Sequence, residues 1–118
     1  MRVDPWRAQS AVTSIEPFQA VFDELPDDLR GLRGVSQQLV AHYMIDGDEP
    51  GGRVTGERLA EVDTRYADAM VARLLALGQP SLARERPTAE RIVGCCRDFA
   101  LLFVAMARHK GFPARIRV

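Results

Sequence analysis

The sequence predicts a mostly α-helical chain of three to four helices with a β-strand at its C-terminal end. Apolar residues recur at intervals of three or four over most of the chain, which is the period of a helix with one buried face. The segment from residue 99 to 107 is almost wholly apolar and is typical of a helix buried on nearly every side. The last five residues alternate between apolar and charged, which is typical of a half-buried strand. The length of 118 residues fits one domain or part of one.

The first 25 residues predict an arm followed by a short helix. Residues 1–16 mix charged, Ser and Thr residues without a clear period, so we expect a loose arm with a short extended piece. A helix is predicted from Pro17, because proline is favoured in a first helical turn. Its apolar face is formed by Phe18, Val21, Phe22 and Leu25.

A second helix is predicted from Pro26 to Tyr43, with Asp27 and Asp28 in its first turn. Its apolar face consists of Leu29, Leu32, Val35, Leu39 and His42 or Tyr43. A histidine at the end of such a face is usually a packed, hydrogen-bonded residue, so we do not assign His42 as a catalytic base. Gln37, in the middle of the helix, is expected at the surface.

Residues 45–54 predict a loop, because they are rich in Gly, Pro and Asp. Their acidic spacing lacks the full ligand series of a calcium loop, so we predict no metal site there. A third helix is predicted from Glu57 to Leu77, capped by Thr55 and ended by Gly78. Its apolar positions are Leu59, Val62, Tyr66, Met70, Leu74 and Leu77. Its opposite face carries Arg58, Glu61, Arg65 and Asp68, which we interpret as solvated helix-spaced ion pairs.

The fourth helix follows a connection over residues 79–93 and begins near Cys96. Asp98 in its first turn and three basic residues in its last turn complement the helix dipole, and Gly111 suits a left-handed cap. A cysteine at a helix start meets unpaired backbone N–H groups and a partial positive charge, which favour the thiolate. Cys96 is therefore a candidate nucleophile. The alternative is an inert packing residue, the usual role of a free cysteine.

Composition excludes several classes of function. The formal net charge is zero, so the chain lacks the basic footprint of a nucleic-acid binder or a polybasic membrane binder. No apolar run approaches the roughly 18 residues of a membrane span, and the N-terminus lacks a signal-peptide core, so a cytoplasmic location is expected. Cys95 and Cys96 are adjacent, so we expect two reduced thiols with no disulfide, metal or cofactor.

The string GCCRDFA at residues 94–100, followed by an apolar helix and GFPAR at 111–115, resembles the transglutaminase-like superfamily. A weaker likeness extends upstream through residues 25–28, 35–42, with Gln37, and 86–87. The resemblance makes Cys96 the nucleophile and Cys95 the variable residue before it, and we give Arg97 and Asp98 a supporting role. The implied fold is the helical half of an α+β, papain-like domain. Residues 1–118 would then form one truncated domain, with an arm (1–16), a helical part (17–93), and a nucleophile helix with the first strand (94–118).

The resemblance also implies a mechanism. The full-length form is expected to carry out thiol-based acyl transfer or amide and peptide hydrolysis through a thioester, with the backbone N–H of Cys96 helping to bind the oxyanion. The family's His and Asp follow the cysteine helix, and His109, about 20 Å along that helix, is too far from the thiol to replace the His. The expected partner is a peptide or protein amide substrate. The alternative is an inactive remnant or a non-catalytic helical module that pairs with a partner through residues 114–118.

Overall fold

The computed structural model describes residues 6–42, 58, 60–61, 64–78 and 80–116. Within these ranges the chain is mostly helical, with four α-helices, short 3₁₀ segments and a two-stranded parallel sheet, which confirms the predicted fold class. In chain order the elements are α1 (Gln19–Asp23), α2 (Leu29–Leu39), β1 (Val40–His42), α3 (Ala67–Leu77), η2 (Thr88–Glu90), β2 (Ile92–Gly94) and α4 (Cys96–His109).

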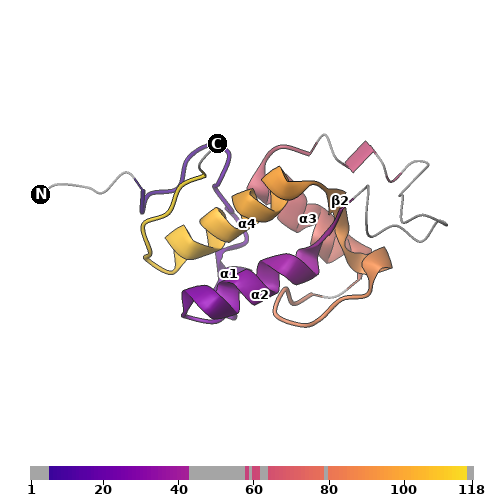
Figure 1. Cartoon of the computed structure of the whole chain (residues 1–118), viewed down its shortest axis with the longest axis horizontal. Coiled ribbons are helices and arrows are strands. Elements are labelled where there is room, and N and C mark those ends of the chain that lie inside the picture. Colours follow the sequence, from indigo (N-terminus) through magenta and orange to yellow (C-terminus); the bar gives the residue numbers. More distant parts are fainter. Residues whose placement is uncertain (1–5, 43–57, 59, 62–63, 79, 117–118) are drawn as a thin grey trace, which may run out of the picture.

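The pairing of α2 with α4 organises the fold (Figure 1). β1 continues directly from α2, and β2 leads directly into α4. The two strands are parallel, with Val40 opposite Ile92 and His42 opposite Gly94. The two helices run in opposite directions. An ion pair of 2.8 Å shows this, since it joins Lys110, after the end of α4, to Asp27, before the start of α2. The start of α4 therefore lies beside the end of α2.

The hydrophobic core lies between α4 and the other three helices. Its members come from every helix and from both strands, so α4 is surrounded by apolar side chains on most of its circumference. The fully buried members include Phe22, Leu32, Leu39, Val40, Met70, Val71, Leu74, Leu102, Ala105 and Met106. The predicted short helix with Phe22 on its buried face is confirmed as α1, and the predicted left-handed cap is confirmed at Gly111, with φ of 88°.

The second helix is shorter than predicted. It begins after Asp28, whose carboxylate caps it by accepting the Gly31 N–H at 2.5 Å, and it ends at Leu39. The predicted continuation to Tyr43 is wrong, because Val40 to His42 form β1. Val40 and Ala41 are buried, and pairing with β2 satisfies backbone groups that a helix would otherwise satisfy internally. Tyr43 lies outside the described residues.

The third helix also begins later than predicted. Tyr66, with φ of −114° and ψ of 136°, is extended and precedes α3, so residues 64–66 are not helical. The N–H of Ala67 donates to Val12 O at 2.8 Å, which fixes this start against the N-terminal segment. The predicted loop at 45–54, the cap Thr55 and the apolar positions Leu59 and Val62 lie outside the described residues.

Both ends of the described chain pack against the body. Residues 6–16 are not a loose arm, because Thr13 and Ile15 are buried and Gln9 Nε2 donates to Ala105 O at 2.9 Å. The predicted C-terminal strand is absent over residues 112–116, which are irregular, and residues 117–118 lie outside the described ranges. The N–H of Ala114 donates to Trp6 O at 2.9 Å, which holds this segment against the N-terminal part of the described chain.

The length and apolarity of a helix decide whether it could cross a membrane. The longest, α4, has 14 residues, and none of those in the described ranges is long and apolar enough to cross a membrane.

Candidate functional site

The site is built at the junction between β2 and the first turn of α4. Gly94 ends β2, Cys95 is the extended N-cap, and Cys96 is the first helical residue. Cys96 is exposed, whereas Cys95 is half-buried. The first N–H groups of a helix have no acceptor within the helix, so the Cys96 thiol lies where backbone donors and the positive end of the dipole are available. This is the position that the sequence predicts for the nucleophile.

Asp98 holds this junction in place. Its side chain is almost fully buried, and Oδ2 accepts the backbone N–H of Cys95 at 2.9 Å. The same carboxylate lies directly over Gly94, where an added Cβ would come within 2.5 Å of Oδ2. Gly94 and Asp98 of the motif are thus in direct contact. This contact fixes the turn between β2 and the helix that carries Cys96.

Arg97 has a different environment from Asp98. Its side chain is 47% exposed, and Nη2 lies 3.4 Å from Asp98 Oδ1. An exposed ion pair of this length contributes little to stability. The sequence predicts the same supporting role for Arg97 and Asp98, but their environments differ: Asp98 is a buried acceptor, and Arg97 lies at the surface beside it.

A groove of about 630 Å³ runs between α2 and α4 and includes Cys96. α4 contributes a stripe of one exposed and three half-buried residues, so the prediction of a helix buried nearly all round is wrong on this side. The facing wall comes from α2 and from the residue before β2. The complete lining is Arg33, Ser36, Gln37, Arg91, Cys96, Phe99, Ala100 and Phe103. Gln37 and Arg91 were not predicted as site residues, because spacing along one helix does not show which neighbour it will face.

Neither histidine lines this groove. His42 pairs with Gly94 across the two strands, two residues before Cys96, but the residues that line the groove do not include it. His109 lies at the opposite end of α4, where Nε2 is 2.7 Å from Asp23 Oδ1 and the ring meets Phe22 edge-on at 5.7 Å between centroids. As predicted, His109 cannot reach the Cys96 thiol, because the helix separates them.

Glu61 binds the backbone of β2 just before the junction, a role that was not predicted. It was expected on a solvated face, but its side chain is only 10% exposed. It accepts the Val93 N–H at 2.9 Å, Arg73 Nε at 2.7 Å and Arg58 Nη2 at 3.2 Å. Burial alone would raise the pKa of this carboxyl, but these hydrogen bonds outweigh burial and leave the pKa below its ordinary value. β2 is therefore anchored by a carboxylate.

Arg86 is a second buried charge that the sequence did not distinguish from its charged neighbours. It is 1% exposed. Its guanidinium donates to the backbone oxygens of Leu74, Ser81 and Glu90, at 2.8, 3.1 and 2.9 Å. Burial lowers the pKa of Arg86, and the nearby Glu90 carboxylate opposes that effect. The contacts tie the end of α3 to η2, and so they position the segment that leads into β2.

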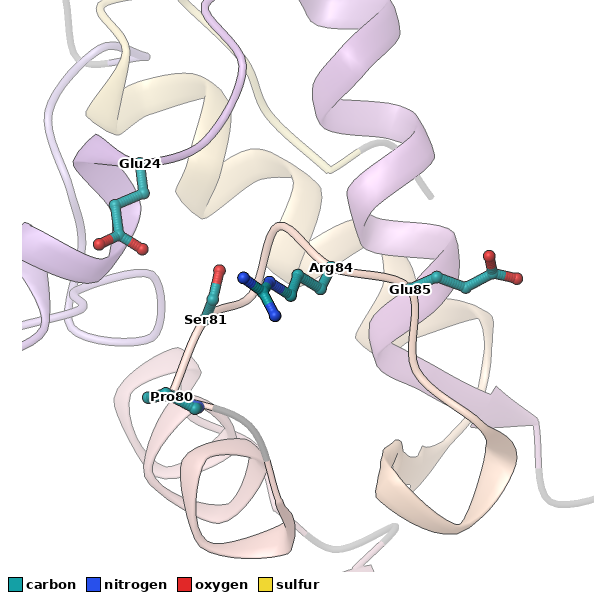
Figure 2. A pocket seen from close by; sticks show the side chains of 5 residues that line it. All are labelled: Glu24, Pro80, Ser81, Arg84 and Glu85. Carbon is teal, nitrogen blue, oxygen red and sulfur yellow. The ribbon is translucent and has the colours of Figure 1, made fainter.

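Two further hollows lack a cysteine. One, of about 590 Å³, is lined by Glu24, Pro80, Ser81, Arg84 and Glu85, and Figure 2 shows the Arg84 guanidinium pointing toward Ser81. Its charges are of both signs. The other, of about 420 Å³, surrounds Glu61 and the arginines that bind it. Of these three hollows, the groove between α2 and α4 is the one that combines an exposed cysteine with an apolar surface.

Comparison with known proteins supports the reading of this junction. The model of the transglutaminase-like superfamily matches residues 78–118. The match contains β2, α4, Arg86 and the whole Gly94-to-Arg115 motif, and it lies in the C-terminal part of the chain. It does not extend to residues 25–28 or 35–42, where a weaker likeness was noted. No curated protein and no solved structure matches the chain.

Proposed function

We propose that Cys96 is the nucleophile of a thiol-based acyl-transfer site, from the premise that residues 78–118 match the model of the transglutaminase-like superfamily. The substrate class is a peptide or protein amide. The observation that carries the proposal is the exposed thiol of Cys96 at the first position of α4, in a turn fixed by Asp98 and opening into a groove.

The proposed reaction has two steps. The Cys96 thiolate attacks the amide carbonyl carbon, the carbonyl oxygen takes up the negative charge, and the backbone N–H of Cys96 donates to that oxygen. The C–N bond then breaks, the amine leaves with a proton from a general acid, and a thioester remains on Cys96. In the second step water or an amine attacks the thioester carbonyl carbon and gives a proton to the general base, the C–S bond breaks, and the acyl product leaves with the thiolate restored.

The natural reaction needs a base for the thiol and a proton donor for the leaving amine. Following the family's order, we assign both roles to a His that is oriented by an Asp, the two lying on strands after α4. His42 and His109, the two histidines of the sequence, do not line the groove that contains Cys96. An activated ester avoids the need for the proton donor, because its leaving group departs without a proton.

The test therefore uses the 118-residue chain and a 4-nitrophenyl acyl ester. We expect one nitrophenolate released per chain and an intact-mass increase equal to one acyl group, mapped to Cys96. Cys96→Ser should abolish both signals, and Cys95→Ser should leave them unchanged. Acylation that disappears equally in the two variants, or that maps to Cys95, would overturn the assignment. Wild type that stays unmodified would favour the non-catalytic binding module.

A further inference from the structure

We infer that the groove between α2 and α4 binds the acyl side of the substrate, and that it selects an apolar side chain followed by a carboxylate about three residues from the scissile bond. This inference rests on the proposed function of Cys96, and it adds a substrate class that the family match does not specify. Two features of the groove indicate this selectivity: the order of its side chains from Cys96 onward and the sign of their charges.

The floor of the groove is an apolar stripe that begins at the nucleophile. Three residues follow Cys96 on the same face of α4, because they lie three, four and seven positions after it: Phe99, Ala100 and Phe103. Phe99 and Phe103 are each half-buried, with part of each side chain packed against the core. The remaining part is aromatic surface beside a thiol, a suitable surface for an apolar substrate side chain.

The charged groups of the groove are all positive. Arg33 and Arg91 line it, and no Asp or Glu does. Arg91 is held in place by hydrogen bonds from Nε to Arg86 O at 2.9 Å and from Nη2 to Gln38 Oε1 at 2.8 Å. Both of these acceptors are neutral. Among the described residues, neither Arg33 nor Arg91 forms an ion pair with a carboxylate, in a chain whose formal net charge is zero. A substrate carboxylate would complement this local excess.

The antiparallel packing of the two helices gives the spacing. The end of α2 lies beside the start of α4, so Gln37 lies toward the Cys96 end and Arg33, one turn earlier, lies toward Phe103. Seven residues of helix span about 10 Å between Cys96 and Phe103. An extended peptide covers that length in about three residues. A carboxylate on the third residue from the acyl carbon would therefore reach Arg33.

The experiment measures acylation rates of the same chain with three 4-nitrophenyl esters: acetyl-Glu-Phe-Gly, acetyl-Lys-Phe-Gly and acetyl-Glu-Ser-Gly. In each reaction the Cys96 sulfur forms a bond to the glycyl carbonyl carbon, and nitrophenolate leaves. We expect the Glu-Phe-Gly ester to react fastest, roughly two- to fivefold above the Lys ester, as fits one exposed charge pair. Loss of the apolar side chain in the Ser ester should lower the rate by roughly tenfold.

Charge reversal provides the matched control. Arg33→Glu should invert the preference between the Glu and Lys esters, whereas Arg30→Glu, an exposed arginine on the same helix that does not line the groove, should not. Ala100→Leu should slow the two Phe-containing esters with little effect on alkylation by iodoacetamide. Equal rates for all three esters, or equal effects of the two arginine variants, would overturn the inference while leaving Cys96 acylation intact. If no ester acylates Cys96, the proposed function itself fails.

Discussion

The carboxylate of Asp98 lies directly over Gly94, with Oδ2 at 2.9 Å from the Cys95 nitrogen and 2.5 Å from where a Cβ on Gly94 would be. This contact joins the end of β2 to the first turn of α4 across Cys95, the residue that precedes Cys96. It explains why a glycine and an aspartate lie four positions apart around Cys96. The glycine leaves the space that the buried carboxylate occupies, and the carboxylate satisfies the N–H at the turn.

Gly94→Ala should therefore destabilise the fold. The new methyl group would overlap the Asp98 carboxylate, which is buried and cannot move into solvent, and overpacking of this kind costs about 1 to 3 kcal/mol. Urea unfolding measures the loss. Gly34→Ala is the control, because Gly34 is an exposed position of α2 with no atom within 4 Å of its added Cβ, and alanine should stabilise a helix there by up to about 1 kcal/mol. Equal effects at the two glycines would contradict the contact.

Asp98 is predicted to be a positioning residue for Cys96. Asp98→Ala removes the acceptor for the Cys95 N–H and should cost about 1 to 2 kcal/mol, the range for a lost helix cap. It should also slow acylation of Cys96 by the activated ester, because the turn that orients the thiol is released. Asp98→Asn keeps an oxygen of the same size and should restore most of the rate.

Asp28→Ala is the matched control for Asp98. Asp28 caps α2 through an exposed hydrogen bond to Gly31, so its loss should lower stability without changing the acylation rate of Cys96. A purely structural role for Asp98 would be indicated if both caps changed stability and neither changed the rate.

Glu61 should make stability depend on acid pH. Its pKa in the folded chain lies below the ordinary value of 4.5, because the hydrogen bonds from Val93, Arg73 and Arg58 outweigh the opposing effect of burial. As pH falls below about 4.5, the unfolded chain takes up a proton before the folded chain does, so the unfolded state binds more protons. The stabilisation is thus present above that pH and lost as pH falls through the folded pKa.

Glu61→Gln should remove this contribution to the pH dependence. Urea midpoints measured from pH 3 to 7 would then rise less steeply with pH than those of wild type. Glu24→Gln is the control, because Glu24 is exposed and, among the described residues, its carboxylate accepts no hydrogen bond and forms no ion pair. Identical pH profiles for wild type and Glu61→Gln would show that the carboxylate does not hold β2.

The sequence predicts the parts of this molecule that depend on local pattern. The start of α4, its acidic first turn and the Gly111 cap follow from helix-end chemistry, and the motif identifies Cys96. The parts that were missed depend on contacts distant in sequence. Val40 to His42 leave the helix because β2, fifty residues later, offers a pairing partner. Glu61 and Arg86 look like surface charges until the backbone groups they bind are known. Helical spacing identifies the apolar residues of α4. It does not show that α2 leaves some of these residues uncovered beside Cys96.

His109 provides the final test, which asks whether either histidine of this chain acts as a base for Cys96. Its ring lies edge-on to the buried Phe22 and bonds to Asp23 at the far end of α4 from the thiol. His109→Ala should lower stability by about 1 kcal/mol through the lost packing and hydrogen bond. The alkylation rate of Cys96 with iodoacetamide should be unchanged from pH 6 to 9. His42→Ala, beside Gly94 in the sheet, is the more demanding comparison, and we expect the same unchanged rate. A slower reaction or an altered pH profile in either variant would show that this chain carries its own base.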